Sequence, residues 1–310
     1  MGVPTGGPHL GLDLGATNLK WAVVERTADG WRALATGQTP TRAEAGPDGI
    51  VAELAEVGLA AERAVGVDVI SVGIGVPGLY DPATGATRFL PNVPGEWAGR
   101  PVAGPVGAAL GAPATLINDA RAFTLAELVL GAGSGFDSIV ALTLGTGVGG
   151  GIAVDRRVLF GHDGTAGEIG HQTIEAEGLP CTCGNRGCLE AYARADRIAE
   201  LCGTSTAEEA ADAARAGDER ALRGLAEAGR FLGIGIANLI VLVNPDRVVI
   251  GGGVAVGAGD LLFEPIRAEI ATRVRITSLA GIDIVAAELG TLAGAIGAAV
   301  HGALVAGGDR

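Results

Sequence analysis

The chain is poor in aromatic and in basic side chains. Aromatic residues make up 4% of its 310 residues and hydrophobic residues 48%, so the core must consist mainly of Ala, Val, Leu and Ile. Lysine and arginine number 22 against 35 aspartates and glutamates, which gives a formal net charge of -13. Binding a polyanion requires clustered Lys and Arg. The composition therefore argues against nucleic acid as the main partner, and we expect any bound phosphate to belong to a small ligand.

Targeting signals are also lacking. The first residues, MGVPTGGPHL, contain neither a basic n-region nor an apolar h-region, so no secretory signal is expected. The Ala/Gly-rich stretch from Leu289 to Ala306 is long enough to span a membrane, but Thr291 and His301 interrupt it. We expect this stretch to form a packed helix of a soluble, cytoplasmic protein without a membrane partner. Structural disulfides are not expected in that reducing setting.

Glycine, in contrast, is abundant, and the 53 glycines have no triplet period. Many flank apolar runs, which indicates tight turns and close backbone approaches. Apolar alternation around a Gly-Ala-Thr-Asn turn predicts a β-hairpin with strands near 9–14 and 19–26. The segment SIVALTLGTGVGGGIAV repeats this plan, and aligning Leu12 with Leu142 brings Gly15 onto Gly145. This match suggests two related halves, each opening with a hairpin.

The remaining pattern alternates helices and strands. We expect helices at 48–64, 121–131, 219–242 and from about Gly290, a helical stretch after Glu190, strands at 69–78, 113–119 and 247–253, and a loop at 81–105. This alternation predicts an α/β fold with parallel or mixed sheets. The length allows two domains. We place a small domain at 1–118 together with a C-terminal helix at about 291–310, and a larger domain at 119–290.

Two glycine-rich turns have a composition suited to phosphate. In DLGATNLK and LGTGVGGG, glycines allow close backbone approach and the turn N–H groups can form an anion-binding nest. Asp13 could hold magnesium, and the hydroxyls of Thr17 and Thr146 could donate to phosphate oxygens. The alternative is a pair of hairpin turns that need glycine for a positive φ. Neither segment matches the G-x-x-x-x-G-K-[ST] loop.

Two further segments carry carboxylates. Asp119 follows the apolar strand that ends in IND, where α/β proteins place their ligands, and it is a candidate general base. The alternative is a helix N-cap, a common use of Asp. In GEIGH, Glu168 and His171 lie three residues apart, which by itself is more typical of a surface or a capped turn.

Three of the four cysteines lie in CTCGNRGCLE. A disulfide between Cys181 and Cys183 is sterically poor, and a closed zinc site commonly takes three Cys and one His. We predict structural Zn²⁺ bound by His171, Cys181, Cys183 and Cys188, with Cys202 as a buried core thiol. If the metal bound one ring nitrogen of His171, the other nitrogen could face a ligand. The turn that brings the cysteines together would place Glu190 near the same ligand.

Together these segments resemble the ROK family of sugar kinases and repressors, and within it the bacterial glucokinases. The resemblance runs from about Leu10 to Ala303, and its most specific part is the array H-x9-C-x-C-G-x2-G-C-x-E. It implies an actin-like, hexokinase-like pair of α/β domains with a ligand cleft between them. It also implies an ATP-dependent, magnesium-requiring kinase of carbohydrate metabolism, acting in glycolysis if glucose is the sugar.

The resemblance also implies roles for individual residues. Asp119 would be the general base that deprotonates the primary hydroxyl of the sugar. The other hydroxyls would be bound by Gly78, Asn92, Asn118, Glu168, His171 and Glu190. The ATP phosphates would lie against Asp13, Gly15, Thr17, Gly145, Thr146 and Gly147, and the adenosine against Gly252 and Gly253.

One position departs from the family pattern. Ala16 stands where the family usually has the second glycine of D-x-G-G-T. A Cβ at a positive φ would cost about 1–2 kcal/mol, so either the turn differs or this residue does not need the unusual dihedral. Asp13 and Thr17 are retained, which favours the kinase.

Several alternatives remain open from the sequence. The acceptor is expected to be glucose, but another hexose such as mannose or fructose, N-acetylmannosamine or a cyclitol has similar hydroxyls. A polyphosphate donor is a weaker alternative, because such relatives typically lack the cysteine array. A sugar-responsive repressor of the same family would carry an N-terminal helix-turn-helix, which we do not expect here because a strand begins near residue 9. Relatives are often homodimers or homotetramers.

Overall fold

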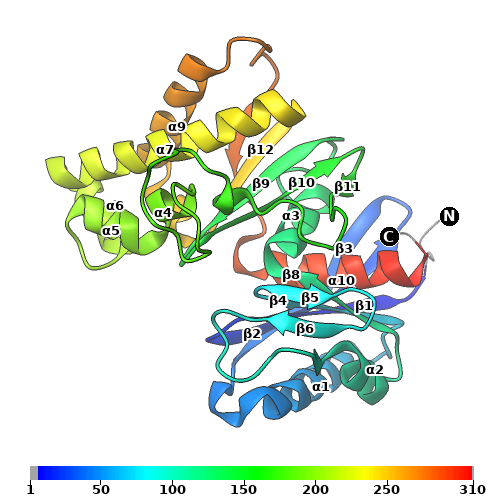
Figure 1. Cartoon of the computed structure of the whole chain (residues 1–310). Coiled ribbons are helices and arrows are strands. Elements are labelled where there is room, and N and C mark those ends of the chain that lie inside the picture. The colour runs from blue at the N-terminus through cyan, green and yellow to red at the C-terminus, as the bar shows by residue number, and fades with distance from the viewer. Residues whose placement is uncertain (1–5, 309–310) are drawn as a thin grey trace. The chain divides into compact units, whose positions relative to one another are not determined.

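The computed structural model describes residues 6–308 and divides the chain into two compact units (Figure 1). Unit 1 comprises Met1–Ser134, Phe160–Ala166 and Thr291–Arg310, and unit 2 comprises Gly135–Leu159 and Gly167–Gly290.

 The chain therefore crosses from unit 2 into unit 1 at Phe160 and returns at Gly167. This division differs from the expected boundary at 118/119, because helix α3 (Asp119–Val129) packs on helix α10 (Ala293–Ala306) and so lies in unit 1.

Unit 1 is built on a five-stranded sheet in the order β3-β2-β1-β4-β8. Its strands are β1 (Pro8–Leu14), β2 (Asn18–Thr27), β3 (Gly30–Pro40), β4 (Ser71–Val76) and β8 (Ala114–Asn118). The first three strands are antiparallel, whereas β4 pairs parallel with both β1 and β8. The hairpin expected at 9–14 and 19–26 and the strands expected at 69–78 and 113–119 are thus confirmed.

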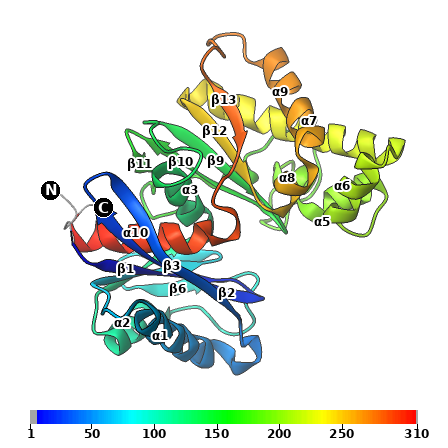
Figure 2. The ribbon, with the colours of Figure 1, turned by 180° about the vertical axis from the view of Figure 1, so that it is seen from behind.

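Helices cover both faces of this sheet (Figures 1 and 2). On one face, α1 (Gly46–Val65) and α2 (Ala103–Leu110) pack over the apolar side chains of β1, β4 and β8. On the other, α10 lies directly on β1 and β4. A Cβ at Gly11 would lie 1.8 Å from the carbonyl oxygen of Ala295, and one at Gly73 would lie 1.7 Å from that of Ala298. Only glycine permits this close approach of helix and sheet.

The prediction that 81–105 forms a loop is wrong. This segment contributes to a three-stranded sheet of β5 (Leu79–Asp81), β6 (Ala86–Phe89) and β7 (Arg100–Pro101), and α2 begins in it. Trp97 is buried here, and its indole Nε1 donates to the carbonyl oxygen of Val93 at 3.0 Å. The strands are too short to show a periodic pattern among the Pro and Gly residues.

Unit 2 repeats the sheet of unit 1. Its strands β9 (Ile139–Leu144), β10 (Val148–Val154), β11 (Arg157–Val158), β12 (Arg247–Gly251) and β13 (Asp283–Ala286) follow the order β11-β10-β9-β12-β13. The directions also correspond, because β9 pairs antiparallel with β10 and parallel with β12, which pairs parallel with β13. The two related halves predicted from the glycine turns are confirmed at the level of topology.

The helices of unit 2 share one hydrophobic core with β9, β10 and β12. They are α4 (Glu190–Ala193), α5 (Ala195–Cys202), α6 (Ala207–Arg215), α7 (Glu219–Val243), α8 (Gly253–Ala258) and α9 (Asp260–Arg273). Figure 2 shows α7 running beside α9, and the two are in extensive contact. No element was predicted between Gly253 and Gly290, where α8, α9 and β13 lie. Pro265 interrupts the helical pattern of α9, and β13 is only four residues long.

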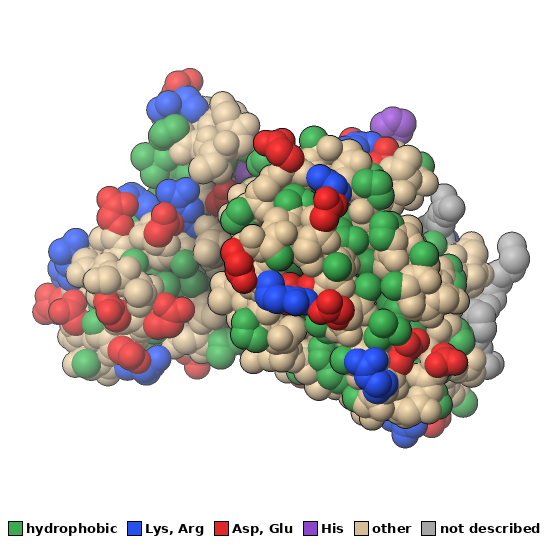
Figure 3. All heavy atoms as spheres, turned by 90° about the horizontal axis from the view of Figure 1, so that it is seen from below, with side chains coloured by type: hydrophobic (Ala, Val, Ile, Leu, Met, Phe, Trp, Pro, Cys, Tyr) green, Lys and Arg blue, Asp and Glu red, His purple; other side chains and the backbone are tan. Residues whose placement is uncertain are grey.

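Among the described residues, α7 is the one helix long and apolar enough to cross a membrane. It is a core helix of unit 2, with Leu225, Leu232, Ile236 and Ile240 fully buried. The stretch Leu289–Ala306, expected to be a packed helix, forms the short turn η3 (Gly290–Leu292) followed by α10, which is buried along most of its length. On the face shown in Figure 3, the Lys and Arg side chains are scattered among Asp and Glu rather than gathered in a patch.

Candidate functional site: a strand-end aspartate, two glycine turns and a cysteine-rich loop

The junction of β8 and α3 carries the predicted base. Asn118 ends the strand and caps the helix, because its side-chain oxygen accepts from the backbone N–H groups of Ala120 and Arg121 at 3.0 and 3.3 Å. Asp119 is therefore the first helical residue and not the N-cap, so the capping alternative is wrong for Asp119. Its Oδ1 accepts from the N–H of Ala120 at 2.8 Å. The arrangement leaves the Asp119 carboxylate half-exposed at the carboxyl end of the strand.

Asn118 also reaches the turn at Gly78. Its Nδ2 donates to the carbonyl oxygen of Gly78 at 3.2 Å. Gly78 has a φ of 121°, and a Cβ there would lie 2.3 Å from the carbonyl oxygen of Phe89, so the turn requires glycine. The structure thus brings together three of the predicted sugar-binding residues, Gly78, Asn118 and Asp119. Asn92 lies exposed between β6 and β7 of the same unit.

Arg121 supports this junction and was not identified from the sequence. Its side chain is 2% exposed. NH1 donates to Oδ1 of Asn118 at 2.8 Å, Nε to the carbonyl oxygen of Ala166 at 2.8 Å, and NH2 to that of Thr165 at 2.9 Å. Arg121 therefore fixes the Asn118 side chain and fastens the segment Phe160–Ala166 to unit 1. The signal in the sequence was a basic residue three positions after the end of a buried strand.

We expect Arg121→Ala to lower the free energy of unfolding by about 3 kcal/mol or more, because one buried and two part-buried acceptors would lose a charged donor. Arg223→Ala is the matched control, since Arg223 is exposed on α7 and pairs with Glu219 one turn away. That change should stay within about 0.5 kcal/mol. Urea unfolding of both variants measures the difference, and equal stabilities would contradict the clamp assigned to Arg121.

The first glycine turn follows β1. The N–H of Gly15 donates to the carbonyl oxygen of Asn18 at 3.0 Å. Oγ1 of Thr41 donates to the carbonyl oxygen of Gly15 at 2.8 Å and so stabilises the turn, a contact that was not predicted from the sequence. Neither Gly15 nor Ala16 is among the described residues with a positive φ. The alternative that this turn needs glycine for a positive φ is therefore wrong. Ala16 fits without backbone strain, which resolves the departure from the family pattern.

Asp13 lies at the end of β1, just before this turn. A Cβ at Gly294 would lie 2.5 Å from its Oδ2 and one at Gly75 3.2 Å from its Oδ1, so two glycines make room for the carboxylate. Burial raises the pKa of Asp13 to about 6, and the positive charge of Lys20 opposes this rise. A carboxylate held in such surroundings is stabilised by a bound cation. Asp13 therefore fits the role of a magnesium-binding carboxylate.

The second glycine turn joins β9 to β10. The N–H of Gly145 donates to the carbonyl oxygen of Gly147 at 3.0 Å, and neither glycine has a positive φ. The turn instead needs Gly147 for space, because a Cβ there would lie 2.5 Å from Oε2 of Glu190. The same oxygen accepts from the N–H of Val148 at 3.0 Å. Glu190, predicted as a sugar ligand, thus contacts the turn predicted to bind phosphate.

We expect Gly147→Ala to lower the free energy of unfolding by about 1–2 kcal/mol, because the new methyl group displaces the Glu190 carboxylate from the N–H of Val148. Gly145→Ala is the control within the same turn, since a Cβ there has no atom within 4 Å. Parallel urea titrations test the pair. A Gly147→Ala protein as stable as Gly145→Ala would show that the carboxylate is not held as the structure indicates.

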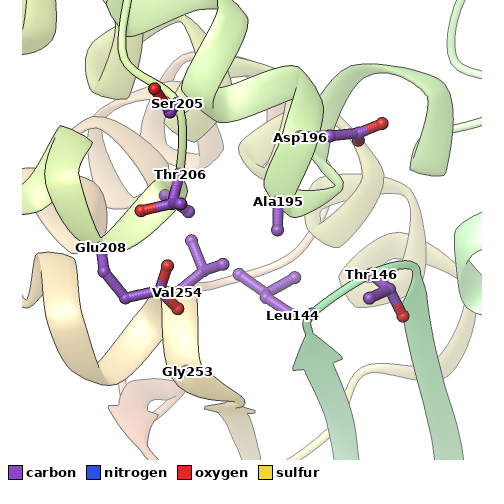
Figure 4. Close-up of a pocket in the computed structure, with 11 residues that line it drawn as sticks. Leu144, Thr146, Ala195, Asp196, Ser205, Thr206, Glu208, Gly253 and Val254 are labelled. Carbon is purple, nitrogen blue, oxygen red and sulfur yellow. The ribbon is translucent and has the colours of Figure 1, made fainter. Parts of the chain in front are cut away.

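A cavity of about 550 Å³ opens beside this second turn, entirely within unit 2. Its lining combines Gly145 and Thr146 of the turn and Leu144 at the end of β9 with residues of α5, α6, α8 and the segment before α6 (Figure 4): Ala195, Asp196, Ser205, Thr206, Ala207, Glu208, Gly253 and Val254. Its volume is in the range typical of small-molecule pockets. Gly253, predicted to border adenosine, lines this cavity.

Gly252 lies next to the lining residue Gly253 and allows two strands to pack closely at the cavity. It precedes α8 with a φ of 92°, and a Cβ there would lie 2.1 Å from the carbonyl oxygen of Leu144, so the turn after β12 packs directly against the end of β9. Asp196, Thr206 and Glu208 were not identified from the sequence. The available signal was the capping box at 206–209, in which the side chain of Thr206 accepts from the N–H of Glu209.

The predicted zinc ligands form one cluster. The donor atoms of His171, Cys181, Cys183 and Cys188 all lie within 4.8 Å of one another. The Cys181 Sγ to His171 Nδ1 distance is 3.7 Å, and the Cys183 Sγ to Cys188 Sγ distance is also 3.7 Å. Bond lengths of about 2.3 Å to sulfur and about 2.0 Å to nitrogen place the corners of a tetrahedron about 3.5–3.8 Å apart. The four residues therefore fit tetrahedral zinc, with Nδ1 as the histidine donor.

Glycines and an asparagine shape this cysteine-rich loop. Gly184 and Gly187 have φ of 91° and 72°, and a Cβ at Gly187 would lie 1.7 Å from the carbonyl oxygen of Glu175. A hydrogen bond from the N–H of Asn185 lowers the pKa of the Cys183 thiol, which favours the metal-binding thiolate. Cys202 is buried in α5 with its Sγ 3.4 Å from the carbonyl oxygen of Ala221, as expected for a core thiol.

Glu190 is adjacent to the metal cluster as well as to the second turn. Its Oε1 lies 4.0 Å from Sγ of Cys181, while its Oε2 binds Val148. Glu168 is exposed and directly precedes the short turn η2 (Ile169–His171) that carries His171. Unit 2 therefore groups Glu190 and His171 around one loop, and Glu168 lies three residues from His171 in the chain.

The model of the ROK family matches residues 9–303. The chain belongs to the ROK family. A ROK protein of Thermotoga maritima, a glucokinase, is 37% identical over 309 residues, covering 94% of this chain and 95% of its own.

Two solved ROK structures resemble the chain over nearly its whole length. The ROK hexokinase from Thermus thermophilus is 35% identical with a TM-score of 0.86, covering 96% of this chain and 99% of its own. The ROK family glucokinase from Streptomyces griseus, in complex with glucose and AMPPNP, is 31% identical with a TM-score of 0.79 and covers 96% and 99%. The fold is therefore the actin-like, two-domain α/β fold predicted from the sequence.

Proposed function

We propose that this ROK protein is an ATP-dependent kinase that transfers the γ-phosphate to the primary hydroxyl of glucose, giving glucose 6-phosphate. The observation that carries the proposal is the junction at Asn118 and Asp119, where the asparagine caps the helix and the half-exposed aspartate follows it at the carboxyl end of β8. The identity of 37% to a glucokinase, and the glucose and AMPPNP bound by the Streptomyces griseus relative, support the choice of sugar and donor.

In this reaction Asp119 is the general base. It takes the proton of the sugar hydroxyl as the oxygen attacks the γ-phosphorus, a bond from that oxygen to phosphorus forms, and the bond to the β,γ-bridging oxygen breaks so that ADP leaves. The remaining hydroxyls are bound by Gly78, Asn92, Asn118, Glu168, His171 and Glu190. Positioning is the main requirement, because phosphoryl transfer needs an oriented nucleophile and little covalent chemistry from the protein.

The nucleotide is bound by the two glycine turns and the cavity of unit 2. Asp13, Gly15 and Thr17 in the first turn, and Gly145, Thr146 and Gly147 in the second, offer N–H and hydroxyl groups to the phosphates. Magnesium, which Asp13 fits, neutralises phosphate charge when bound. The cavity bordered by Gly253 and shaped by Gly252 takes the adenosine.

The zinc that the cysteine-rich loop fits has a structural role, because four protein ligands leave no open position. Nδ1 of His171 would hold the metal, which would orient the imidazole and leave Nε2 to bind a sugar hydroxyl. The proposed location is the cytoplasm. We further propose that the enzyme acts in glycolysis. It is proposed to form a homodimer or a homotetramer, and light scattering tests this oligomeric state.

A coupled ADP-release assay tests the function. The panel contains glucose, mannose, fructose, N-acetylmannosamine and a cyclitol, each with ATP, and glucose with polyphosphate as the alternative donor. We expect the highest kcat/KM with glucose and ATP. A higher value for another acceptor or donor would reassign the substrate, and no ADP release with any sugar would contradict the kinase.

A further inference from the structure

A second cavity, of about 340 Å³, lies within unit 1, and none of its lining residues belongs to the proposed sugar or nucleotide sites. It opens between the start of β2, the end of β3 and helix α1, which contacts both strands. Its lining consists of Trp21, Thr39, Pro40, Arg42, Glu53, Glu56, Val57 and Ala60. The volume lies at the lower end of the range for small-molecule sites, so the cavity suits a ligand the size of a single sugar ring.

The polar and aromatic walls of this cavity are held in place. Glu53 is buried on α1, where its Oε2 accepts from the backbone N–H of Arg42 at 3.0 Å and its Oε1 lies 3.2 Å from Nε of the same residue. The far end of that guanidinium pairs with Glu56, one turn along α1. A Cβ at Gly37 would lie 2.5 Å from the indole of Trp21, so the ring packs directly on the backbone of β3. Walls that are fixed before a ligand arrives lower the entropy cost of binding.

The lining offers both donors and an acceptor to a ligand. Within residues 6–308, the indole N–H of Trp21 and the hydroxyl of Thr39 have no hydrogen-bond partner, and Arg42 bonds Oε2 of Glu56 but not its Oε1. A cation could pair with this carboxylate but would leave both donors unused, whereas a hydroxyl both donates and accepts. The apolar surfaces of Pro40 and Val57 complete a wall suited to the C–H groups of a sugar ring.

The charge of the lining argues against an anion. Two carboxylates face one guanidinium, and the whole chain has a net charge of -13. A phosphorylated sugar or a nucleotide would therefore be repelled. A neutral sugar fits both the charge and the hydrogen-bonding groups.

A single residue connects this cavity to the first glycine turn. Thr41 lies between Pro40 and Arg42, which both line the cavity. Its N–H donates to the carbonyl oxygen of Thr17 at 2.9 Å, and its Oγ1 donates to that of Gly15 at 2.8 Å. A ligand that shifts the chain at 40–42 therefore shifts a residue that is bonded to the turn at two points.

We propose that this cavity binds a neutral sugar as an effector, and that its occupancy changes the affinity of the first glycine turn for nucleotide through Thr41. The sugar site stands on the cavity itself, whereas the effect on nucleotide rests on the proposed kinase function. The cavity offers three unpaired hydrogen-bonding groups, fewer than the residues proposed to bind the substrate sugar. It therefore fills at higher sugar concentrations than the catalytic site.

Equilibrium dialysis with labelled glucose tests the second site. We expect two glucose molecules per wild-type chain and one per Ala60→Phe chain, because the new ring fills the cavity. Ala52→Phe is the matched control, since it makes the same change at an exposed alanine of α1 outside the lining, and it should bind two. A single glucose per wild-type chain at about 50 mM, far above a Kd of about 1 mM, would overturn the proposal. Glucose 6-phosphate that binds the cavity more tightly than glucose would contradict a neutral ligand.

Calorimetric titration with magnesium and AMPPNP, an ATP analogue, tests the coupling. One series contains enough glucose to fill the tighter site alone, and the other enough to fill both. We expect the Kd of the nucleotide to differ by at least about fivefold between the series for the wild type and Ala52→Phe, and to stay constant for Ala60→Phe. Thr41→Val keeps the side-chain size and removes the Oγ1 donor, so it should bind two glucose molecules but lose most of the difference. An unchanged nucleotide Kd in the wild type would overturn the coupling.

The outcomes separate this inference from the proposed function. If the wild type releases no ADP with any sugar but binds two glucose molecules, the kinase proposal fails and the second site stands. If the wild type is active and binds one glucose, the inference fails alone. Thermal unfolding shows whether Ala60→Phe is folded. If it is not, Glu56→Gln replaces it and should weaken binding at the second site by about tenfold or more, because a charged acceptor is lost.

Discussion

Asp119→Ala is expected to lower kcat by about 10²- to 10⁴-fold, the usual contribution of a positioned general base. The fold should survive, because Asn118 rather than Asp119 caps α3. Sugar binding should be weakened but measurable, since Asn118 and Gly78 stay in place. The coupled ADP-release assay gives kcat, and calorimetric titration with glucose gives the affinity.

Two further variants sharpen this test. Asp119→Asn keeps the size of the side chain and removes its basicity, so it should lose as much activity as Asp119→Ala. Asp212→Ala is the control, because Asp212 is an exposed carboxylate on α6 that pairs with Arg215. Turnover of Asp119→Asn close to that of the wild type would mean that another group accepts the proton.

Removal of the metal is the second change with a large expected effect. We expect the purified protein to contain one zinc per chain, and Cys188→Ser to abolish that content. Because structural zinc contributes about 10–16 kcal/mol of binding free energy in small zinc domains, loss of a ligand should disorder the loop from His171 to Cys188. The affinity for the sugar should then fall by about 10- to 100-fold. Plasma mass spectrometry measures the metal.

The fourth cysteine supplies the control for this experiment. Cys202 is 3% exposed in α5 and lies outside the metal cluster, so Cys202→Ser should keep both zinc and sugar affinity. A strong chelator should reproduce the effect of Cys188→Ser on the wild-type protein. Wild-type protein that contains no zinc after expression with ample metal would contradict the site.

The sequence predicts those parts of the site in which neighbouring residues determine the geometry. The cysteine array is local, because its spacing and the GNRG turn bring the donors together, and the structure groups all four. The two hairpins follow from alternation and a turn, and their shared strand order extends the match between Leu12 and Leu142 to whole sheets.

Features that depend on contacts distant in sequence were missed. The clamp of Arg121 exists only because Phe160–Ala166 folds onto α3, and the lining by Asp196 and Glu208 only because α5 and α6 pack beside β9. The boundary at 118/119 differs for the same reason, since α3 packs against a helix that begins at Ala293. The N-cap of α3 is Asn118 and not Asp119, and the sequence pattern does not locate the start of a helix to within one residue.

The position of Glu190 has a thermodynamic consequence for the proposed enzyme. One carboxylate oxygen is bound to the N–H of Val148 in the turn that would hold phosphate, and the other lies beside Cys181 in the loop that would hold the sugar. A ligand that shifts this carboxylate on either side changes the free energy of binding on the other. Linkage requires that change to be equal in both directions. In the proposed enzyme, glucose and nucleotide would then not be independent ligands, because each would alter the affinity for the other through a single side chain.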